Sequence, residues 1–128
     1  MLKPVQLGKN SGLRVSQLCL GTMNFGKPGQ GHQADWTLGL DESREIFKAA
    51  IERGLYYFDC ADTYGIGACE EVVGQLLKEL LPREEYVLGT KIAMPMGLNP
   101  NMGGLSRKHI IEGVNNSLQR LGHDYIDH

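Results

Sequence analysis

The feature that most constrains this chain is an alternation of short apolar runs with longer segments of helical periodicity. The short runs lie at 18–20, 56–59, 86–91 and, at the end of the chain, 125–127. A strand that alternates with a helix is typical of a parallel sheet, because each helix carries the chain back to the edge where the next strand starts. The pattern predicts an α/β protein.

Three segments between these runs predict helices, over 41–54, 68–81 and 106–122. Asp41 and Ser106 are predicted N-caps, Gly54 and Gly122 are predicted to end their helices, and Pro82 is expected to stop the second helix. The side chains expected to face the core are Ile46, Phe47, Ala50 and Ile51, then Val72, Val73, Leu76, Leu77 and Leu80, and finally Ile110, Ile111, Val114, Leu118 and Leu121.

The first part of the chain differs from the rest. Two extended runs, 4–7 and 13–15, flank a glycine-containing loop at 8–12 and predict a β-hairpin. The glycine-rich stretch after the 18–20 run is too long for a plain connector, so we expect it to be functional or mobile. We predict a single domain over 1–128, with the hairpin in 1–17, the βα units in 18–122 and the start of a fourth strand in 125–128.

Composition narrows the class of partner. The chain has 128 residues and a formal net charge of −2, with no basic block, so we expect no nucleic-acid partner. No apolar stretch approaches the roughly 18 residues that a membrane span needs, so we expect no membrane partner. Three cysteines without a C-x-x-C pair predict reduced thiols in a cytoplasmic protein. Zinc is the alternative, but it would need a fourth ligand and closer spacing, so no metal is predicted.

Three polar residues fall where chemistry is expected in a parallel fold, at the carboxyl ends of the strands. Asp59 closes the second predicted strand, Lys91 closes the third, and Tyr64 follows the second. Neighbouring strands lie about 4.8 Å apart, so the carboxylate and the ammonium are expected to pair. A phenol beside that ammonium ionises more readily and becomes a suitable general acid. A purely structural ion pair with a packing tyrosine is the alternative.

Two further features have competing interpretations. The segment 65–70, GIGACE, has the glycine spacing of a dinucleotide fingerprint, but Glu70 stands where that motif needs Gly or Ala. The glycines are better interpreted as a tight entry to a helix, with Glu70 and Glu71 in its first turn. Trp36, in the long loop, is a candidate for lining a substrate pocket, although simple packing is the favoured interpretation.

Several motifs resemble those of the aldo-keto reductase family. The segment 58–65, FDCADTYG, is similar to the family signature F-D-T-A-x-x-Y-G, and 20–26, LGTMNFG, is similar to L-G-T-x-x-F-G. Thr90 and Lys91 match the T-K that ends the third strand. The segments 104–113, 117–122 and 124–127 resemble the corresponding parts of potassium-channel β subunits and related bacterial reductases. The resemblance covers nearly the whole chain.

The resemblance implies a fold and an activity. The fold would be the N-terminal half of a (β/α)8 TIM barrel, preceded by a β-hairpin that plugs the barrel floor. The activity would be reduction of a small aldehyde or ketone, with hydride from NADPH and a proton from Tyr64. The resemblance implies that Lys91 tunes Tyr64 and that Asp59 supports Lys91. It also implies that the cofactor contacts Gly21, Thr22, Met23 and Asp59.

The chain departs from the family pattern near its end. His128 stands where the family has an apolar strand residue, so we do not assign it the family's catalytic histidine role. The later strands and the phosphate-binding loop do not appear, and we expect a truncated chain that self-associates through open sheet edges. Two alternatives to a reductase remain: a regulatory binding module of the channel β-subunit kind, and a non-catalytic half-barrel.

Overall fold

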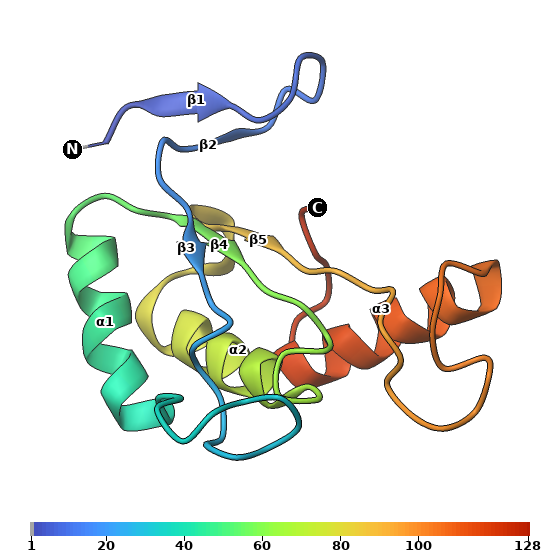
Figure 1. Ribbon diagram of the computed structural model, residues 1–128. Coiled ribbons are helices and arrows are strands. Elements are labelled where there is room, and N and C mark those ends of the chain that lie inside the picture. Colours follow the sequence, from blue (N-terminus) through green and yellow to red (C-terminus); the bar gives the residue numbers. More distant parts are fainter. Residues whose placement is uncertain (1) are drawn as a thin grey trace.

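A computed structural model describes residues 2–128, so the first residue of the predicted hairpin segment lies outside it. The chain forms a hairpin followed by three βα units (Figure 1). Its elements in order are β1 (Pro4–Gln6), β2 (Arg14–Ser16), β3 (Leu20–Gly21), α1 (Leu40–Glu52), β4 (Tyr57–Asp59), α2 (Ala68–Leu80), the 3-10 helix η1 (Arg83–Glu85), β5 (Val87–Gly89) and α3 (Arg107–Leu121). Strands β3, β4 and β5 form a parallel sheet in that order, which confirms the predicted α/β class.

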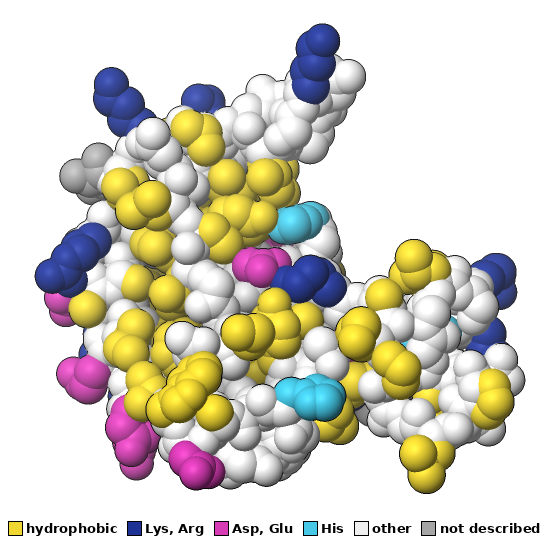
Figure 2. Space-filling model, in the orientation of Figure 1, with side chains coloured by type: hydrophobic (Ala, Val, Ile, Leu, Met, Phe, Trp, Pro, Cys, Tyr) yellow, Lys and Arg dark blue, Asp and Glu magenta, His cyan; other side chains and the backbone are white. Residues whose placement is uncertain are grey.

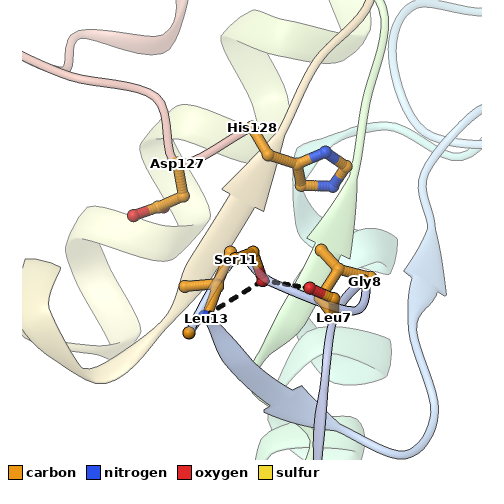
Figure 3. A pocket seen from close by; sticks show the side chains of 7 residues that line it. Leu7, Gly8, Ser11, Leu13, Asp127 and His128 are labelled. Carbon is orange, nitrogen blue, oxygen red and sulfur yellow. Dashed lines mark hydrogen bonds between the residues drawn. The ribbon is translucent and has the colours of Figure 1, made fainter.

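The predicted hairpin is confirmed. Strands β1 and β2 pair antiparallel, with Val5 opposite Val15, and Leu7 N donates to Leu13 O at 2.8 Å to close the loop. The hairpin lies at the end of the sheet where β3 begins (Figure 1), and Ser16 Oγ of β2 accepts from Tyr56 N, next to β4, at 3.2 Å. Between its loop and residues 127–128 lies an open hollow of about 770 Å³ (Figure 3). None of the predicted catalytic residues lines this hollow.

The core lies between the sheet and helices α1 and α2, which lie on the same face of it (Figure 1). Phe47 of α1 stacks on Phe58 of β4 with ring centroids 5.4 Å apart, and both are fully buried. The apolar stripe of α2 is buried as predicted, because its period places those side chains on the sheet. Four of its side chains are almost completely buried: Val72, Val73, Leu76 and Leu77.

Two predicted boundaries in the first unit are wrong. Helix α1 begins at Leu40 after Gly39, without a side-chain cap; Asp41 lies in the first turn and pairs with Arg44 instead. The first parallel strand is Leu20–Gly21 rather than 18–20, because only Leu20 and Gly21 find partners on β4. Leu18 is therefore 58% exposed. Ile46 of α1 was predicted to face the core and is also exposed.

Helix α3 has the predicted ends but a different buried face. Ser106 accepts a hydrogen bond from His109 N at 3.1 Å, and Gly122 adopts the left-handed conformation at the C-terminus. The fully buried positions are His109, Gly113, Ser117 and Leu121, a single i, i+4 row. Ile110 and Ile111, predicted core residues, are 41% and 42% exposed. Helix α3 packs closely on α2 where the Leu121 carbonyl meets Gly74, and Leu121 is the one predicted core residue of α3 that is fully buried.

The predicted fourth strand, 125–127, is not formed. Asp127 N donates to Leu88 O at 3.0 Å, which is a strand-like contact with β5. However, Leu88 N donates to the Asp127 carboxylate at 2.8 Å rather than to a backbone carbonyl. Arg83 also binds that carboxylate, at 2.7 Å. The side chain of Asp127 therefore takes a donor that a regular ladder would use.

Candidate functional site

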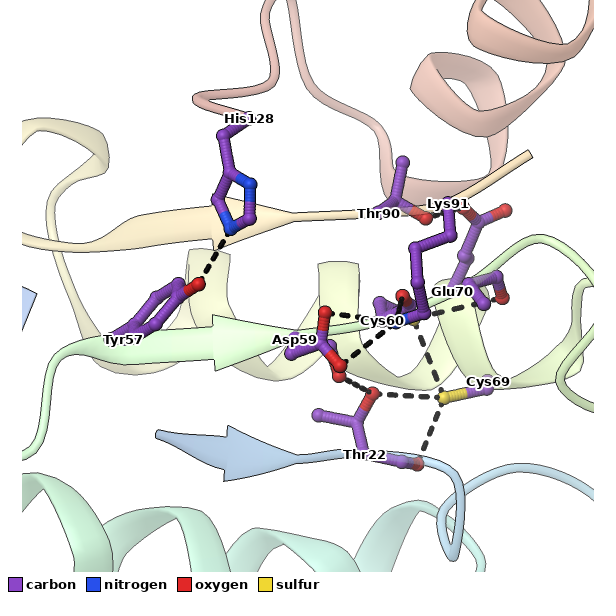
Figure 4. A network of polar contacts seen from close by, with 10 residues as sticks. Thr22, Tyr57, Asp59, Cys60, Cys69, Glu70, Thr90, Lys91 and His128 are labelled. Carbon is purple, nitrogen blue, oxygen red and sulfur yellow. Dashed lines mark hydrogen bonds and ion pairs between the residues drawn. The ribbon is translucent and has the colours of Figure 1, made fainter. Parts of the chain in front are cut away.

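The carboxyl ends of β4 and β5 bring together an ion pair. Asp59 ends β4, and Lys91 follows the end of β5 by two residues rather than closing that strand as predicted. Lys91 Nζ donates to both Asp59 oxygens at 2.8 Å and also to the carbonyl oxygen of Cys60 (Figure 4). The side chains of Asp59 and Lys91 are 37% and 49% exposed, so the pair lies at the surface and is open to a ligand.

The ammonium of Lys91 also lies against the phenol ring of Tyr64. Its Nζ is 5.1 Å from the ring centroid, within the range of a cation–π contact. Burial lowers the pKa of Lys91, but hydrogen bonds and charge from Asp59, together with Tyr64, outweigh it, so the pKa is raised. Lys91 is therefore a stable cation near neutral pH. The structure thus brings Asp59, Tyr64 and Lys91 together; their catalytic roles stay a prediction.

The turn after β4 fixes the backbone that carries Tyr64. Gly65 and Gly67 both have positive φ, and the latter adopts +91° at the N-terminus of α2. A Cβ on Gly65 would lie 2.2 Å from Gln33 Oε1, so the turn packs directly against the long first loop. Cys69 N donates to Tyr64 O at 3.2 Å. The glycines therefore serve a tight helix entry, as interpreted from the sequence.

The predicted cofactor residues lie beside Asp59. Gly21 is opposite Asp59 in the sheet register, and no atom lies within 4 Å of the position a Cβ would take there. Met23 is 55% exposed. Thr22 is fully buried, and both its N and its Oγ1 donate to Asp59 O, at 3.0 and 2.8 Å. Open space at Gly21 fits an approaching cofactor, whereas the Thr22 side chain anchors Asp59 and does not face a ligand.

A cavity of about 290 Å³ lies beside the Tyr64 phenol. Its walls are mainly apolar and come from the first loop, the turn after β4 and the loop between β5 and α3. The lining residues are Met23, His32, Gln33, Ala34, Trp36, Thr37, Thr63, Tyr64, Gly65 and Met94. Trp36 lines this cavity and is 64% exposed, so packing does not bury it; contact with a substrate stays a prediction. The cavity can accommodate the apolar part of a small ligand next to Tyr64.

Gln33, which the sequence reading missed, gives the first loop its shape. Its amide donates to Phe25 O at 2.8 Å and accepts from Lys27 N at 3.0 Å. The side chain is 9% exposed, and these bonds fold the loop back on itself. No local signal distinguishes this glutamine from a solvated one. The role of Gln33 can be recognised only from the contacts it makes in the folded loop.

The three cysteines are free thiols. Cys60 and Cys69 are fully buried with their sulfur atoms 3.5 Å apart, and hydrogen bonding to Cys69 and burial raise the pKa of Cys60. Partial desolvation and the Asp59 carboxylate raise the pKa of Cys19 to about 11. None of these observations favours a nucleophilic thiolate.

Residues 2–128 offer neither a cluster of metal-ligating side chains nor a helix suited to a bilayer. In that range, no group of three or more His, Cys, Asp and Glu side chains is arranged to hold a metal ion. None of the helices there has both the length and the hydropathy that crossing a bilayer would take. Hydrophobic side chains show at the surface in several places, including over the exposed side of the sheet (Figure 2).

A buried ionic network lies behind the exposed pair. Glu70 does lie in the first turn of α2, but it is fully buried rather than solvated. Its carboxylate accepts from Arg120 Nε at 2.6 Å and from Thr90 Oγ1 at 2.7 Å (Figure 4 shows the contact with Thr90). Arg120 is 50 residues away in the chain, so no spacing rule could have paired them.

Comparison with known proteins gives consistent matches. Residues 17–128 match the profile of the Aldo/keto reductase family. A protein named as a probable voltage-gated potassium channel subunit beta from Oryza sativa subsp. japonica is 40% identical, covering 91% of this chain and 33% of its own. A putative aryl-alcohol dehydrogenase from Saccharomyces cerevisiae is 38% identical, covering 99% and 41%.

A solved structure shows the same arrangement. The holo form of an aldo-keto reductase from Bacillus halodurans superposes with a TM-score of 0.71 at 35% identity, covering 98% of this chain and 38% of that one. The chain therefore spans between a third and about two fifths of the length of these relatives.

Proposed function

The chain belongs to the aldo/keto reductase family of oxidoreductases, and we propose that it forms the proton-donating part of an NADPH-dependent carbonyl reductase. The observation that carries the proposal is the ammonium of Lys91, held by both Asp59 oxygens at 2.8 Å and lying 5.1 Å from the centroid of the Tyr64 ring. The fold would be the first half of a (β/α)8 barrel, as the neighbouring reductase structure supports.

The proposed chemistry divides between cofactor and protein. When bound, NADPH supplies hydride to the carbonyl carbon. Tyr64 donates its proton to the carbonyl oxygen as negative charge builds there. Lys91 stabilises the charge left on the phenol oxygen, and Asp59 keeps Lys91 in place and protonated. Gly21 and Met23 leave open space beside Asp59, where the nicotinamide side of the cofactor would lie.

We propose that the substrate is a small apolar aldehyde or ketone, in particular an aromatic one. The cavity beside Tyr64 is about 290 Å³, which suits one aromatic ring with its carbonyl group. Trp36, Met23 and Met94 present apolar surface there, and Trp36 offers a face for stacking. The name of the yeast relative, a putative aryl-alcohol dehydrogenase, is consistent with such a substrate.

The test is NADPH oxidation by the purified protein with 4-nitrobenzaldehyde. Tyr64→Phe removes the proton donor, and we expect kcat to fall by about 10²–10⁴-fold, the usual contribution of a general acid. Tyr125→Phe is the matched control, because Tyr125 is an exposed tyrosine outside the site. If Tyr64→Phe retained wild-type turnover, the assignment of the proton donor would be wrong.

A regulatory role is the second candidate, since three of the relatives are named as channel β subunits, at 40–42% identity. A regulatory module would bind NADPH, measurable by quenching of Trp36 fluorescence, without turning over carbonyls. A non-catalytic half-barrel would show neither binding nor turnover. Turnover that depends on Tyr64 would exclude both as complete descriptions of the protein.

A further inference from the structure

We infer that Glu70 and Thr90 are positioning residues for Lys91, with Arg120 holding Glu70. The inference rests on the proposed function, because it concerns the placement of Lys91 in the proposed site. None of the three is assigned to contact substrate or cofactor. They form a chain of contacts from α3 through α2 to the end of β5, next to Lys91.

The first step in this series of contacts is the buried ion pair between the Glu70 carboxylate and Arg120. The Glu70 carboxylate is fully buried, and an uncompensated charge there would be strongly destabilising. Arg120 Nε donates to Glu70 Oε2 at 2.6 Å, and its guanidinium also donates to Ser117 at 3.3 Å. Gly67 makes room for this arginine, because a Cβ there would lie 2.4 Å from Arg120 Cδ. The carboxylate is therefore held at one position.

The second step links the Glu70 carboxylate to the candidate site through Thr90. Strand β5 ends at Gly89, and beyond it Thr90 N donates to His128 O at 3.1 Å, so the Thr90 side chain and Lys91 are fixed by further contacts. Thr90 Oγ1 donates to Glu70 Oε1 at 2.7 Å, and Asp62 N donates to Lys91 O at 3.1 Å. With its backbone held from both sides, Lys91 can reach Asp59 and Tyr64 together. A small displacement of such a group is costly, since a misplacement of about 1 Å can reduce rate on the order of 10²-fold.

A purely structural ion pair in the same protein provides the comparison. Arg44 of α1 binds Glu79 of α2 at 2.8 Å, and its side chain is 21% exposed, the same fraction as that of Arg120. Glu79, however, is 41% exposed and has no contact with a residue next to Lys91. Comparing variants of the two pairs therefore distinguishes the effect of losing an arginine–glutamate ion pair from the effect of losing the link to Lys91.

The decisive variant is Thr90→Val, which removes the hydroxyl and leaves the Arg120–Glu70 pair intact. We expect kcat for 4-nitrobenzaldehyde to fall about 10–100-fold with little change in KM, because placement of Lys91 is lost while binding surfaces remain. We also expect the Lys91 ammonium, followed by heteronuclear NMR and assigned with Lys91→Met, to titrate closer to the ordinary lysine pKa. Thr90→Ser, which keeps the hydroxyl, is expected to restore both readouts, and Arg44→Met to alter neither.

Removal of the charge is tested with a variant that can still fold. Arg120→Met alone leaves Glu70 unpaired in the interior, whereas Glu70→Gln with Arg120→Met replaces both charges and keeps an oxygen that can accept from Thr90. Because the double variant lacks the arginine that holds the side chain at position 70, we expect its Lys91 titration to shift in the direction seen in Thr90→Val; a wild-type titration would overturn the role given to Arg120. An unchanged kcat and an unchanged Lys91 titration in Thr90→Val would overturn the inference while the reductase function stood.

The two proposals fail in different ways. If the wild-type protein reduced no carbonyl, the proposed function would fail, but the Lys91 titration in Thr90→Val would still decide whether Thr90 and Glu70 position that lysine.

Discussion

Helices α2 and α3 both carry an apolar stripe of five predicted core residues, yet α2 buries four of its five and α3 buries one. On α2 the predicted residues Val73, Leu76 and Leu77 have no exposed surface. On α3 the predicted Ile110 and Ile111 are exposed, and the helix buries Leu121 together with His109, Gly113 and Ser117, which were not predicted. The two helices nevertheless share the largest contact between elements in the described chain.

The difference shows that periodicity reveals a face but not what covers it. Helix α2 lies across the sheet, so its apolar face meets Phe58 and Leu88 and the hydrophobic effect places it there. Helix α3 has no strand beneath it among residues 2–128 and packs on α2 instead. The close approach of the two helices requires a glycine at position 74 of α2, where the Leu121 carbonyl of α3 lies, and Ile110 and Ile111 remain exposed.

The strongest test of this comparison is Leu76→Ala on α2. The side chain is fully buried, so its removal loses burial and leaves a cavity, and we expect the free energy of unfolding to fall by about 2–5 kcal/mol. Urea denaturation followed by circular dichroism measures it. A loss well under 1 kcal/mol would mean that α2 is not packed on the sheet as described.

The same reasoning explains how much of the fold the sequence predicted. The hairpin, the α2 stripe and the Ser106 cap depend on residues close together in sequence, and all three are confirmed. The buried face of α3 and the missing fourth strand depend on distant partners. Asp127, for example, disrupts the ladder through its carboxylate, which binds Leu88 N and Arg83, and no local pattern contains that information.

The candidate site divides in the same way. Asp59, Tyr64 and Lys91 could be predicted to meet, because the carboxyl ends of parallel strands share one edge of the sheet. Glu70 could not be recognised as buried, since its partners Thr90 and Arg120 lie 20 and 50 residues away. Which residues end a strand can be predicted from nearby sequence, whereas the buried contacts behind that strand end depend on residues far apart in the chain.

A second test addresses the contact between the two helices, through Gly74→Ala. A Cβ at this position would lie 2.1 Å from the Leu121 carbonyl oxygen, which is backbone and cannot swing aside. We expect a loss of about 1–3 kcal/mol from overpacking, although alanine favours helices. Gly113→Ala is the matched control, since the atoms nearest its Cβ would belong to the Ile92 side chain, at 2.8 Å, rather than to backbone. Equal effects would contradict the close backbone approach at Gly74.

A third test uses pH to probe the end of α3. His123 hydrogen bonds with Tyr86 and Leu121, and burial lowers its pKa below the ordinary 6.5. A histidine with a lowered pKa in the folded state favours folding when neutral, so this contribution is present above pH 6.5 and declines as pH falls below it. We expect Tm to fall over this range in the wild type and less in His123→Gln. His32→Gln, at an exposed position, should keep the wild-type profile; a His123→Gln profile identical to the wild type would contradict the assignment.

The smallest effect is expected on the exposed stripe of α3, with Ile110→Ser and Ile111→Ser combined. Because both side chains are about two fifths exposed, we expect the free energy of unfolding to change by roughly 0.5 kcal/mol or less.

We also propose that the 128-residue chain self-associates, since within residues 2–128 only β4 pairs with β3, leaving the other edge of β3 open. Sedimentation velocity over a concentration series should show association, and weaker association in the double variant if the stripe takes part. A sharp monomer peak at every concentration would contradict the proposed association. In the double variant, a fall of several kcal/mol in the free energy of unfolding would show that Ile110 and Ile111 are covered after all, which would remove the contrast with α2.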